Sequence, residues 1–388
     1  MNFPLLIIVS ALLHVYIGAR VLAELAPYPW AAFLFILVLG ASAAFMPLGM
    51  LARRISRPPL ADVLTWVGLL FMGLFSSLFV ITVLRDALLA VLWLGNALVP
   101  GQLDLPNLRY VTALAVPIGG LLATLLGFWN ARRTAAIRWV EVPIAGLPEV
   151  LRGFTIAQIS DVHVGPTIKR GYLRRIVAKV NSLEPDMVAI TGDLVDGQVH
   201  ELAAHVAPLA DLKSRHGSYF VTGNHEYYSG AHAWISELRR LGVRVLMNEH
   251  VVLEHRLRGS PGHSSAALVV AGVADWSAHL FDPAHRSDPG AAIAGAPENA
   301  GVRMLLAHQP RSAAAAAAAG FDLQLSGHTH GGQFWPWVYF VKLQQPFTAG
   351  LHRVGKLWVY TSRGTGYWGP PNRFGSPSEI TCIKLIAE

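Results

Sequence analysis

The stretch Gly327-His328-Thr329-His330-Gly331-Gly332 directly follows a short run of strand-forming residues, Leu323–Ser326, and it decides the fold of the surrounding region. Histidines at alternate positions in a glycine-rich turn place two imidazole rings on one side of the chain and leave room for an ion beside them. In open α/β sheets, ligands bind at the carboxyl ends of the strands. The sequence therefore predicts an α/β domain whose ligand-binding groups follow its strands.

From about residue 140 onward, short β-rich runs alternate with helical patterns, which is typical of a layered α/β domain. The predicted strands are Phe154–Ser160, Met187–Thr191, Tyr219–Thr222, Ala267–Val273, Met304–Ala307, Leu323–Ser326, Leu357–Thr361 and Ile380–Ile386. The predicted helices are Arg170–Leu183, His200–Leu212, Ala231–Leu241 and Ser312–Ala319. Gly259–Ser265 and Asp282–Gly301 are rich in Gly, Pro, Ser and Ala, and we expect loops there.

Polar residues that can bind metal ions gather directly after these predicted strands. They are Asp161, His163, Asp193, Asp196, Asn224, His225, His308, His328 and His330. Without cations, the carboxylates would repel one another and buried imidazoles would be poorly solvated. Oxygen and imidazole ligands without sulfur favour Mn, Fe, Zn or Co over calcium, and they also disfavour magnesium. The number of ligands exceeds what one ion needs, so it suits two ions bridged by one carboxylate.

The first third of the chain differs in composition from this domain. Over all 388 residues, 53% are hydrophobic and 14% are charged, and the mean hydropathy is +0.42. Soluble domains carry about 25% charged residues, so part of the chain is expected to lie in lipid. The single cysteine, Cys382, excludes a disulfide scaffold and a cysteine zinc cluster, and it fits a reducing compartment.

Four uninterrupted apolar runs each reach, or nearly reach, the ~20 residues that cross a hydrocarbon core as a helix. They are Phe3–Ala19, Leu25–Ala52, Val63–Leu84 and Tyr110–Ala131. A further run, Ala87–Leu103, would add a fifth span, but Arg85 and Asp86 leave too short a turn before it. We therefore predict an α-helical membrane bundle of about four helices in residues 1–135, a linker in 136–153, and the α/β domain in 154–388.

The charge distribution sets the expected topology. Residues 1–140 hold nine Lys and Arg and four Asp and Glu, which is +5 of the net charge of +7. The excess thus flanks the apolar runs, and no nucleic-acid partner is expected. Arginine clusters mark cytoplasmic ends of membrane helices, which places both termini and the α/β domain in the cytoplasm. The clusters are Arg53, Arg54 and Arg57 after the second run and Arg132, Arg133 and Arg138 after the fourth, against Arg20, Arg85 and Arg109 on the other side.

Five sequence blocks occur in a fixed order along the α/β domain. They are Asp161-Val162-His163, Gly192-Asp193-Leu194-Val195-Asp196, Gly223-Asn224-His225-Glu226, His308, and Gly327-His328-Thr329-His330. Together they resemble the calcineurin-like metallophosphoesterase superfamily over about residues 154–386. Gly331-Gly332-Gln333 and Ser362-Arg363-Gly364-Thr365-Gly366-Tyr367 resemble its membrane-anchored bacterial branch and the transmembrane metallophosphoesterase-domain proteins. The resemblance implies a layered β-sandwich flanked by helices, in a protein of a bacterial inner membrane.

The resemblance also implies a role for each residue of these blocks. It assigns Asp161, His163 and His330 to one divalent ion, Asn224, His308 and His328 to the other, and Asp193 as the bridge between them. His225 then faces the substrate, where it stabilises the transition state or protonates the leaving oxygen, and Asp196 orients it. Glu226 replaces the more familiar aspartate at the end of its block. Arg363 and Arg373 are candidates to contact phosphate, and a surface or loop-bracing role for each remains open.

The function that the resemblance implies is hydrolysis of a phosphodiester, phosphomonoester or pyrophosphate bond with two divalent ions, of which Mn, Fe and Zn are preferred. The alternative is a catalytically silent membrane receptor or scaffold that binds a phosphorylated ligand, although no ligand position is lost. A transport function is disfavoured, because no Asp, Glu, Lys or Arg lies within the four apolar runs and His14 is interpreted as a packing or interfacial residue.

A lipid-linked substrate at the membrane surface is a further hypothesis. The linker of ~20 residues would hold the domain near the bilayer. Aromatic residues also crowd the sequence after the histidine pair, where Trp and Tyr with a following Lys342 suit an interfacial patch. They are Phe334, Trp335, Trp337, Tyr339 and Phe340, with Tyr367, Trp368 and Pro370 later. The same residues could instead form part of the core.

Overall fold

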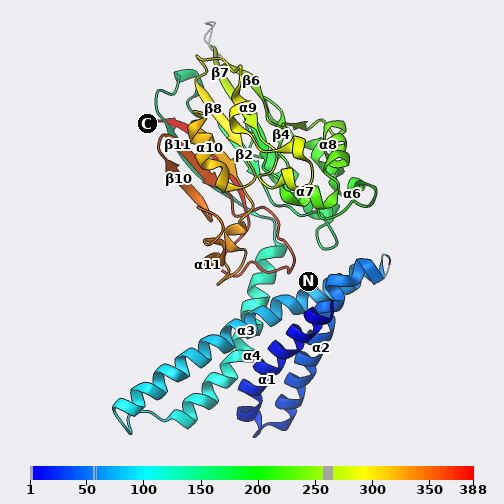
Figure 1. Cartoon of the computed structure of the whole chain (residues 1–388), viewed down its shortest axis with the longest axis vertical. Coiled ribbons are helices and arrows are strands. Elements are labelled where there is room, and N and C mark those ends of the chain that lie inside the picture. The colour runs from blue at the N-terminus through cyan, green and yellow to red at the C-terminus, as the bar shows by residue number, and fades with distance from the viewer. Residues whose placement is uncertain (1–2, 56, 58, 257–264) are drawn as a thin grey trace. The chain divides into compact units, whose positions relative to one another are not determined.

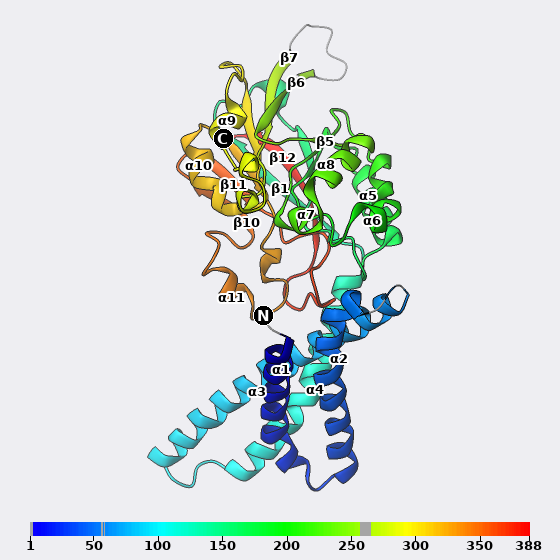
Figure 2. The same cartoon turned by 45° about the vertical axis from the view of Figure 1, so that its right-hand side comes forward.

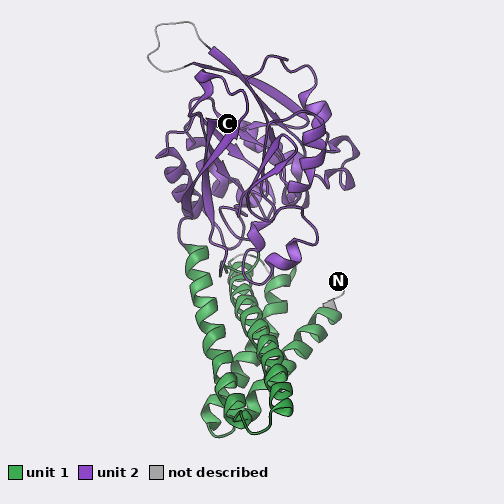
Figure 3. Cartoon of the chain, turned by 90° about the vertical axis from the view of Figure 1, so that its left-hand side faces the viewer, with its two compact units in different colours: residues 1–132, 369–374 green, residues 133–368, 375–388 purple. Residues whose placement is uncertain are grey.

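The computed structural model describes residues 3–55, 57, 59–256 and 265–388 and divides the chain into two compact units (Figure 3). Unit 1 is formed by Met1–Arg132 and Gly369–Phe374, and unit 2 by Arg133–Trp368 and Gly375–Glu388. The segment 136–153, expected to be a linker, instead contains strand β1 (Ala136–Ile144) and one turn of 3-10 helix. The inclusion of residues 369–374 in unit 1 was not predicted by the sequence.

Unit 1 contains four long apolar helices (Figure 1). They are α1 (Phe3–Val21), α2 (Pro29–Ile55), α3 (Leu60–Leu98) and α4 (Leu105–Arg132). Among the described residues, these four are long and apolar enough to cross a membrane. Helix α3 has 39 residues and continues without a break through Arg85 and Asp86. The run Ala87–Leu103, considered above as a fifth span, therefore mostly extends the third helix, to roughly 58 Å in length.

The helices of unit 1 bury a narrow apolar seam and expose large apolar side chains on their outer faces. The seam includes Ile17, Leu39, Leu78 and Val116, all under a tenth exposed. Helices α2 and α3 approach closely at Gly49 and Gly68, where a Cβ on either residue would lie 2.6 Å from the Cα of the other. Small residues at a close helix crossing, with exposed apolar faces outside, are typical of membrane bundles.

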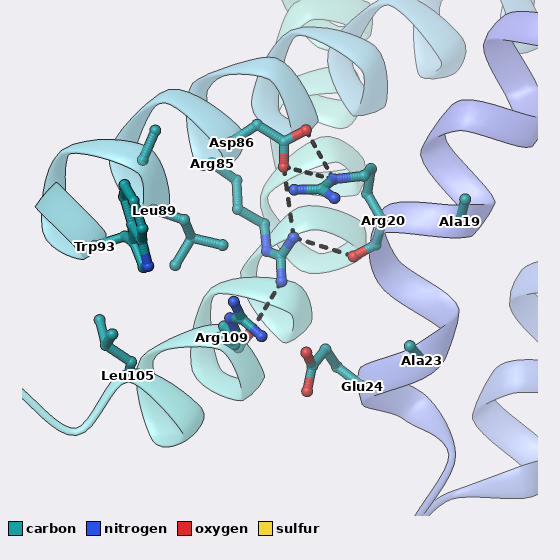
Figure 4. Close-up of a pocket in the computed structure, with 11 residues that line it drawn as sticks. Ala19, Arg20, Ala23, Glu24, Arg85, Asp86, Leu89, Trp93, Leu105 and Arg109 are labelled. Atoms are coloured by element: carbon teal, nitrogen blue, oxygen red, sulfur yellow. Dashed lines mark hydrogen bonds and ion pairs between the residues drawn. The ribbon is translucent and has the colours of Figure 1, made fainter.

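A charged cluster joins three of these helices at the end where α4 begins (Figure 4). The side chain of Arg85 is buried, and it donates to the backbone carbonyls of Arg20 and Arg109, each at 3.0 Å. Asp86 forms an ion pair with Arg20 at 2.8 Å and accepts a hydrogen bond from the Tyr16 hydroxyl at 2.7 Å. Arg85 therefore satisfies the carbonyls of two neighbouring helices, and Asp86 supplies its countercharge.

Unit 2 contains two six-stranded mixed sheets. The first has the order β1 (Ala136–Ile144), β12 (Glu379–Ala387), β2 (Thr155–Ile159), β3 (Met187–Ile190), β4 (Ser218–Phe220) and β5 (Arg244–Val245). The second has the order β10 (Gly350–Val354), β11 (Leu357–Thr361), β9 (Leu323–Ser326), β8 (Val302–Leu306), β7 (Ser265–Gly272) and β6 (Glu249–Arg256). Strands β2, β3 and β4 are parallel neighbours, as are β7, β8 and β9.

The facing sides of the two sheets form the main core of unit 2, with buried side chains such as Ile156 and Met187 from one sheet and Val270 and Met304 from the other. Helices α5 (Arg170–Asn181), α6 (Val199–Val206) and α8 (Ala231–Arg240) lie together on one side, and α9 (Pro289–Ile293) and α10 (Ala313–Ala318) cover the second sheet (Figure 2). Because these strands are buried on both faces, their sequences are continuous apolar runs. The predicted α/β sandwich flanked by helices is confirmed.

The eight predicted strands and four predicted helices all occur, with ends shifted by up to two residues for the strands. The predicted helix His200–Leu212 is divided into α6 and a 3-10 turn. Within the predicted loop Asp282–Gly301, the chain forms short helical turns including α9. Of the predicted loop Gly259–Ser265, all but Ser265 lies outside the described residues.

Candidate metal centre

All nine candidate polar residues lie in segments that directly follow parallel strands. Asp161 and His163 follow β2, Asp193 and Asp196 follow β3, and Asn224 and His225 begin helix α7 (Asn224–Ser229) after β4; His308 follows β8, and His328 and His330 follow β9. The loops after β2 and β3 are tied together by a parallel bridge between Val164 and Val195. Parallel pairing thus brings these chain-distant groups to one edge of the sandwich.

The backbone is strained where it carries these residues. Asp161, His163, Asp193, His328 and His330 all have positive φ, between 51° and 71°, a region that side-chain-bearing residues rarely adopt. Such outliers cluster at functional sites, because the surrounding structure must over-determine them to hold reactive groups in place.

Asp161, His163 and His330 form the first ligand cluster, and all three are buried. The two imidazole Nε2 atoms of His163 and His330 lie 3.0 Å apart, and His330 Nε2 lies 3.4 Å from Asp161 Oδ1. The backbone N–H of His328 donates to the Asp161 carboxylate at 2.9 Å, which fixes that carboxylate's orientation.

Asp193, His308 and His328 form the second ligand cluster. His308 Nε2 lies 3.1 Å from Asp193 Oδ2 and 3.2 Å from His328 Nδ1. The other ring nitrogen of His308 is 2.7 Å from the Thr191 carbonyl oxygen, so it donates there and leaves Nε2 as the ligand atom. Asn224 Oδ1 is buried and has no hydrogen-bond partner among the described residues.

These donors fit divalent cations. Ligand atoms bound to one ion at the usual 2.0–2.2 Å lie about 3.0–3.4 Å apart, which matches the separations within each cluster. A buried amide oxygen without a partner is costly, and a cation at that position would satisfy Asn224. Asp193 Oδ2 lies 3.1 Å from His308 Nε2 in its own cluster and 4.0 Å from His163 Nε2 in the other. Asp193 is therefore the carboxylate that can contact both ions.

His225 and Asp196 lie beside these clusters. His225 Nδ1 lies 2.6 Å from Asp196 Oδ1, and its Nε2 lies 4.0 Å from Asp193 Oδ2. The same Asp196 oxygen is 3.1 Å from His163 Nδ1. Asp196 therefore orients two histidines, one in the first ligand cluster and one facing Asp193, whereas the sequence interpretation gave it only His225.

The pKa values of the site residues depend on their burial and on the charged groups next to them. Burial raises the pKa of Asp161. Burial alone would also raise the pKa of Asp193, but the facing His308 and His225 hold it well below its usual value. Burial opposes the charged form of His225, yet Asp193 and Asp196 raise its pKa to about 9. In the protein alone, protonated histidines thus supply the countercharge that bound cations would provide.

Glu226 has a structural role that the sequence did not reveal. Its fully buried carboxylate accepts hydrogen bonds from the backbone N–H groups of Gly223, Asp193 and Leu194, at 2.6, 3.0 and 2.7 Å. Burial, followed by the nearby Asp193 carboxylate, raises the pKa of Glu226 to about 8. Glu226 therefore locks the Gly223 turn to the Asp193 turn, which holds the bridging carboxylate in position.

Two aromatic rings pack against His225. Tyr228 and Trp368 have ring centroids 5.2 and 5.7 Å from the His225 imidazole, and their side chains are mostly exposed. The backbone of Trp368 is held by the Gln333 side chain, which donates to its carbonyl and accepts from its N–H. Tyr228 lies three residues after His225 on α7, outside the sequence block, and no pattern in the sequence singled it out.

The two candidate arginines differ. The backbone N–H of Arg363 donates to Glu379, and its side chain lies against Gly331, beside His330, where a Cβ on that glycine would come within 3.0 Å of Arg363 Cγ. Arg373 is fully buried in unit 1, and its backbone N–H donates to the Gly127 carbonyl of α4 at 2.9 Å. These described hydrogen bonds are made by the backbone of Arg373, and a phosphate-binding or bracing role for its side chain stays a prediction.

Comparison with known proteins identifies the family of unit 2. The calcineurin-like phosphoesterase family matches residues 154–332. An uncharacterized metallophosphoesterase of Campylobacter jejuni is 33% identical over 280 residues, which cover 72% of this chain and 70% of that protein. The chain belongs to the calcineurin-like metallophosphoesterase family. A second uncharacterized metallophosphoesterase, of Helicobacter pylori, is 36% identical over 73% of each chain.

This metallophosphoesterase is also similar to a membrane protein of animals. A transmembrane protein with metallophosphoesterase domain from Danio rerio is 41% identical over 279 residues, which cover 71% of this chain and 62% of that one. The chain thus spans less than two thirds of the length of that relative. The family assignment made from the motifs is confirmed, and with the four apolar helices it describes a membrane protein with a metallophosphoesterase domain. Metallophosphoesterases use a dinuclear divalent metal centre, for which the two ligand clusters are the candidates.

Proposed function

We propose that this metallophosphoesterase hydrolyses a phosphoester bond with two divalent cations. The observation that carries the proposal is the pair of ligand clusters joined through Asp193, with His225 directly beside that carboxylate. Asp161, His163 and His330 would hold one cation, and Asn224, His308 and His328 the other. When bound, such a pair of cations lowers the pKa of a water and stabilises charge on the phosphoryl oxygens.

The residues of the chain supply the remaining chemistry. Asp196 holds Nδ1 of His225, so Nε2 points toward the side where Asp193 lies. An imidazolium in that position can donate its Nε2 proton to the oxygen that leaves phosphorus. Glu226, which fastens the turns carrying Asp193 and His225, preserves the distance between proton donor and cations.

A substrate panel tests the proposed activity. Imidazole, amide and carboxylate donors suit Mn, Fe or Zn, so we propose these ions. The purified full-length chain, loaded with manganese, is expected to hydrolyse at least one of an aryl phosphomonoester, an aryl phosphodiester and pyrophosphate. Bound metal without hydrolysis of any phosphoester would favour the receptor alternative instead.

We also propose that the substrate is held at a membrane surface. After the metal-binding turn, Trp335, Trp337, Tyr339 and Phe340 are 41–58% exposed, so these residues are not part of the core. Lys342 lies 5.6 Å from the Tyr339 ring, which adds a positive charge to this aromatic segment. Exposed Trp and Tyr with a neighbouring cation suit the interface between water and lipid headgroups. Tyr367, which the sequence grouped with them, is buried and belongs to the core.

The chain connection supports the same proposal. Helix α4 ends at Arg132 and β1 begins at Ala136, so residues 133–135 alone separate a membrane helix from the first strand of unit 2. The four steps of the backbone from Arg132 to Ala136 span at most about 14 Å. The metallophosphoesterase domain therefore begins close to the end of a membrane helix.

The lipid hypothesis predicts a difference between substrates. Hydrolysis of a lipid phosphoester in mixed micelles is expected to exceed that of its water-soluble headgroup. Trp335→Ala should lower kcat/KM on the micellar substrate by about 10-fold, because it removes roughly 1.4 kcal/mol of interfacial contact, and leave the soluble substrate unaffected. Val252→Ala, which truncates an exposed apolar side chain on β6, is the control. Equal efficiency on both substrates in wild type and Trp335→Ala would exclude a lipid-linked substrate.

We further propose that unit 2 faces the cytoplasm of a bacterium from its inner membrane. The support is the arginine excess after the second and fourth apolar helices, since such clusters mark the cytoplasmic side.

Reporter fusions at two positions test this topology. A fluorescent protein fused after Glu388 is expected to be bright and alkaline phosphatase fused there inactive. Fusions after Gly101, between α3 and α4, should give the reverse pattern. Active phosphatase at residue 388 would place the metallophosphoesterase domain outside.

A further inference from the structure

A second group of metal-ligating side chains lies outside the candidate dinuclear centre. His232 lies on α8, Asp282 precedes a 3-10 turn (Pro283–His285), and His285 ends that turn. One ligand atom from each of the three lies within 4.8 Å of the others. His232 Nε2 is 3.1 Å and His285 Nε2 is 3.9 Å from the same oxygen, Asp282 Oδ2.

The two distances to Asp282 Oδ2 bracket the separation expected between ligands of a tetrahedral zinc ion. Zinc bonds of about 2.0–2.1 Å in a tetrahedron place ligand atoms about 3.3–3.4 Å apart, a value between the two measured distances. Two imidazoles and one carboxylate supply three ligands, and the 74% exposure of the His232 side chain leaves room for a water as the fourth.

Hydrogen bonds to their other polar atoms orient two of the three ligands. His285 Nδ1 is 2.9 Å from the Tyr227 hydroxyl, which leaves Nε2 to face Asp282. Asp282 Oδ1 accepts the N–H of Ala284 at 3.0 Å, which leaves Oδ2 toward the histidines. Metal-binding histidines and carboxylates are held in this way by hydrogen bonds from their other polar atom.

We propose that His232, Asp282 and His285 bind a zinc ion that is separate from the dinuclear centre. The ion would fasten α8 to the segment containing Phe281. The Phe281 ring packs 5.6 Å from Tyr228, whose ring in turn lies 5.2 Å from His225. The zinc therefore stabilises the position of the Phe281 and Tyr228 rings that lie next to His225. This proposal does not depend on the proposed phosphoesterase function.

The test counts zinc per chain in the full-length protein. After chelation and dialysis against zinc, His232→Ala and Asp282→Asn are each expected to bind one ion fewer than wild type. Asn at position 282 can still accept the Ala284 N–H, so the turn is preserved. His279→Ala, which removes a histidine from the same segment that contacts only the Trp276 carbonyl and ring among the described residues, should retain the wild-type count.

An Asp193→Asn background separates this site from the dinuclear centre. In that background the triad should still hold one zinc, and adding His232→Ala should remove it. Equal zinc content in wild type, His232→Ala and Asp282→Asn would overturn the proposal and leave the three residues as a surface ion-pair cluster. Loss of one ion from His279→Ala as well would also overturn it, because the effect would then not be specific to the triad.

Discussion

Asp193→Asn is expected to lose both ions of the dinuclear centre together with phosphoester hydrolysis. The Asp193 carboxylate is almost fully buried, belongs to the second ligand cluster, and lies 4.0 Å from His163 Nε2 in the first. An amide has nearly the same shape but no charge, so two cations would face each other without the anion between them. We expect the rate to fall by roughly 10³-fold or more, with bound metal measured by mass spectrometry on the same sample.

Two measurements make this expectation specific. Asp211→Asn changes an exposed carboxylate on the same unit and should leave metal content and rate unchanged. The far-ultraviolet circular dichroism of Asp193→Asn should match wild type, because its backbone N–H still donates to Glu226 and its side-chain oxygen can still accept the His225 N–H. Full activity with two bound ions in Asp193→Asn would refute the bridging assignment.

The fold of unit 2 could be predicted where local pattern and burial agree. Strands β9 and β11 have the predicted ends, because their apolar runs are bounded by turn residues. Strand β6 was missed although its signal was present, since Val251, Leu253 and His255 alternate with exposed residues. Strand β1 could not be predicted from its own sequence, because it is an edge strand in which only Val142 and Ile144 are buried. Its partner β12 lies over 200 residues later in the chain.

The candidate site was predictable to a different extent. Each ligand type follows a strand in the sequence, and parallel pairing gathers strand ends, so the clusters around Asp161 and Asp193 could be expected. Asp196 contacts both His163 and His225, and Glu226 accepts hydrogen bonds from three backbone N–H groups. These contacts depend on how the turns after different strands meet. No spacing within one segment encodes such contacts.

His225→Ala is expected to keep both ions and lose turnover. His225 Nε2 lies 4.0 Å from Asp193 Oδ2, farther than the 3.1 Å of His308, so its removal leaves the ligand clusters intact. Loss of a positioned proton donor lowers kcat by about 10²–10⁴-fold. Substrates whose leaving group needs no proton, such as nitrophenolate esters, should suffer less than alkyl esters. If His225→Ala lost both ions while His330→Ala lost neither, the roles of these histidines would be reversed.

The pH profile distinguishes proton donation from a structural role of His225. An imidazolium donates only below its pKa, so wild-type kcat should fall as pH rises through that value. Burial lowers the pKa of His225, but Asp193 and Asp196 raise it to about 9, and cations beside Asp193 would cancel part of that increase. The alkaline decline should therefore lie below about pH 9 in the metal-loaded enzyme. Asp196→Asn removes one raising charge and should move the decline to lower pH by about one unit, whereas His225→Ala should lack it. An unchanged alkaline decline in His225→Ala would show that another group donates the proton.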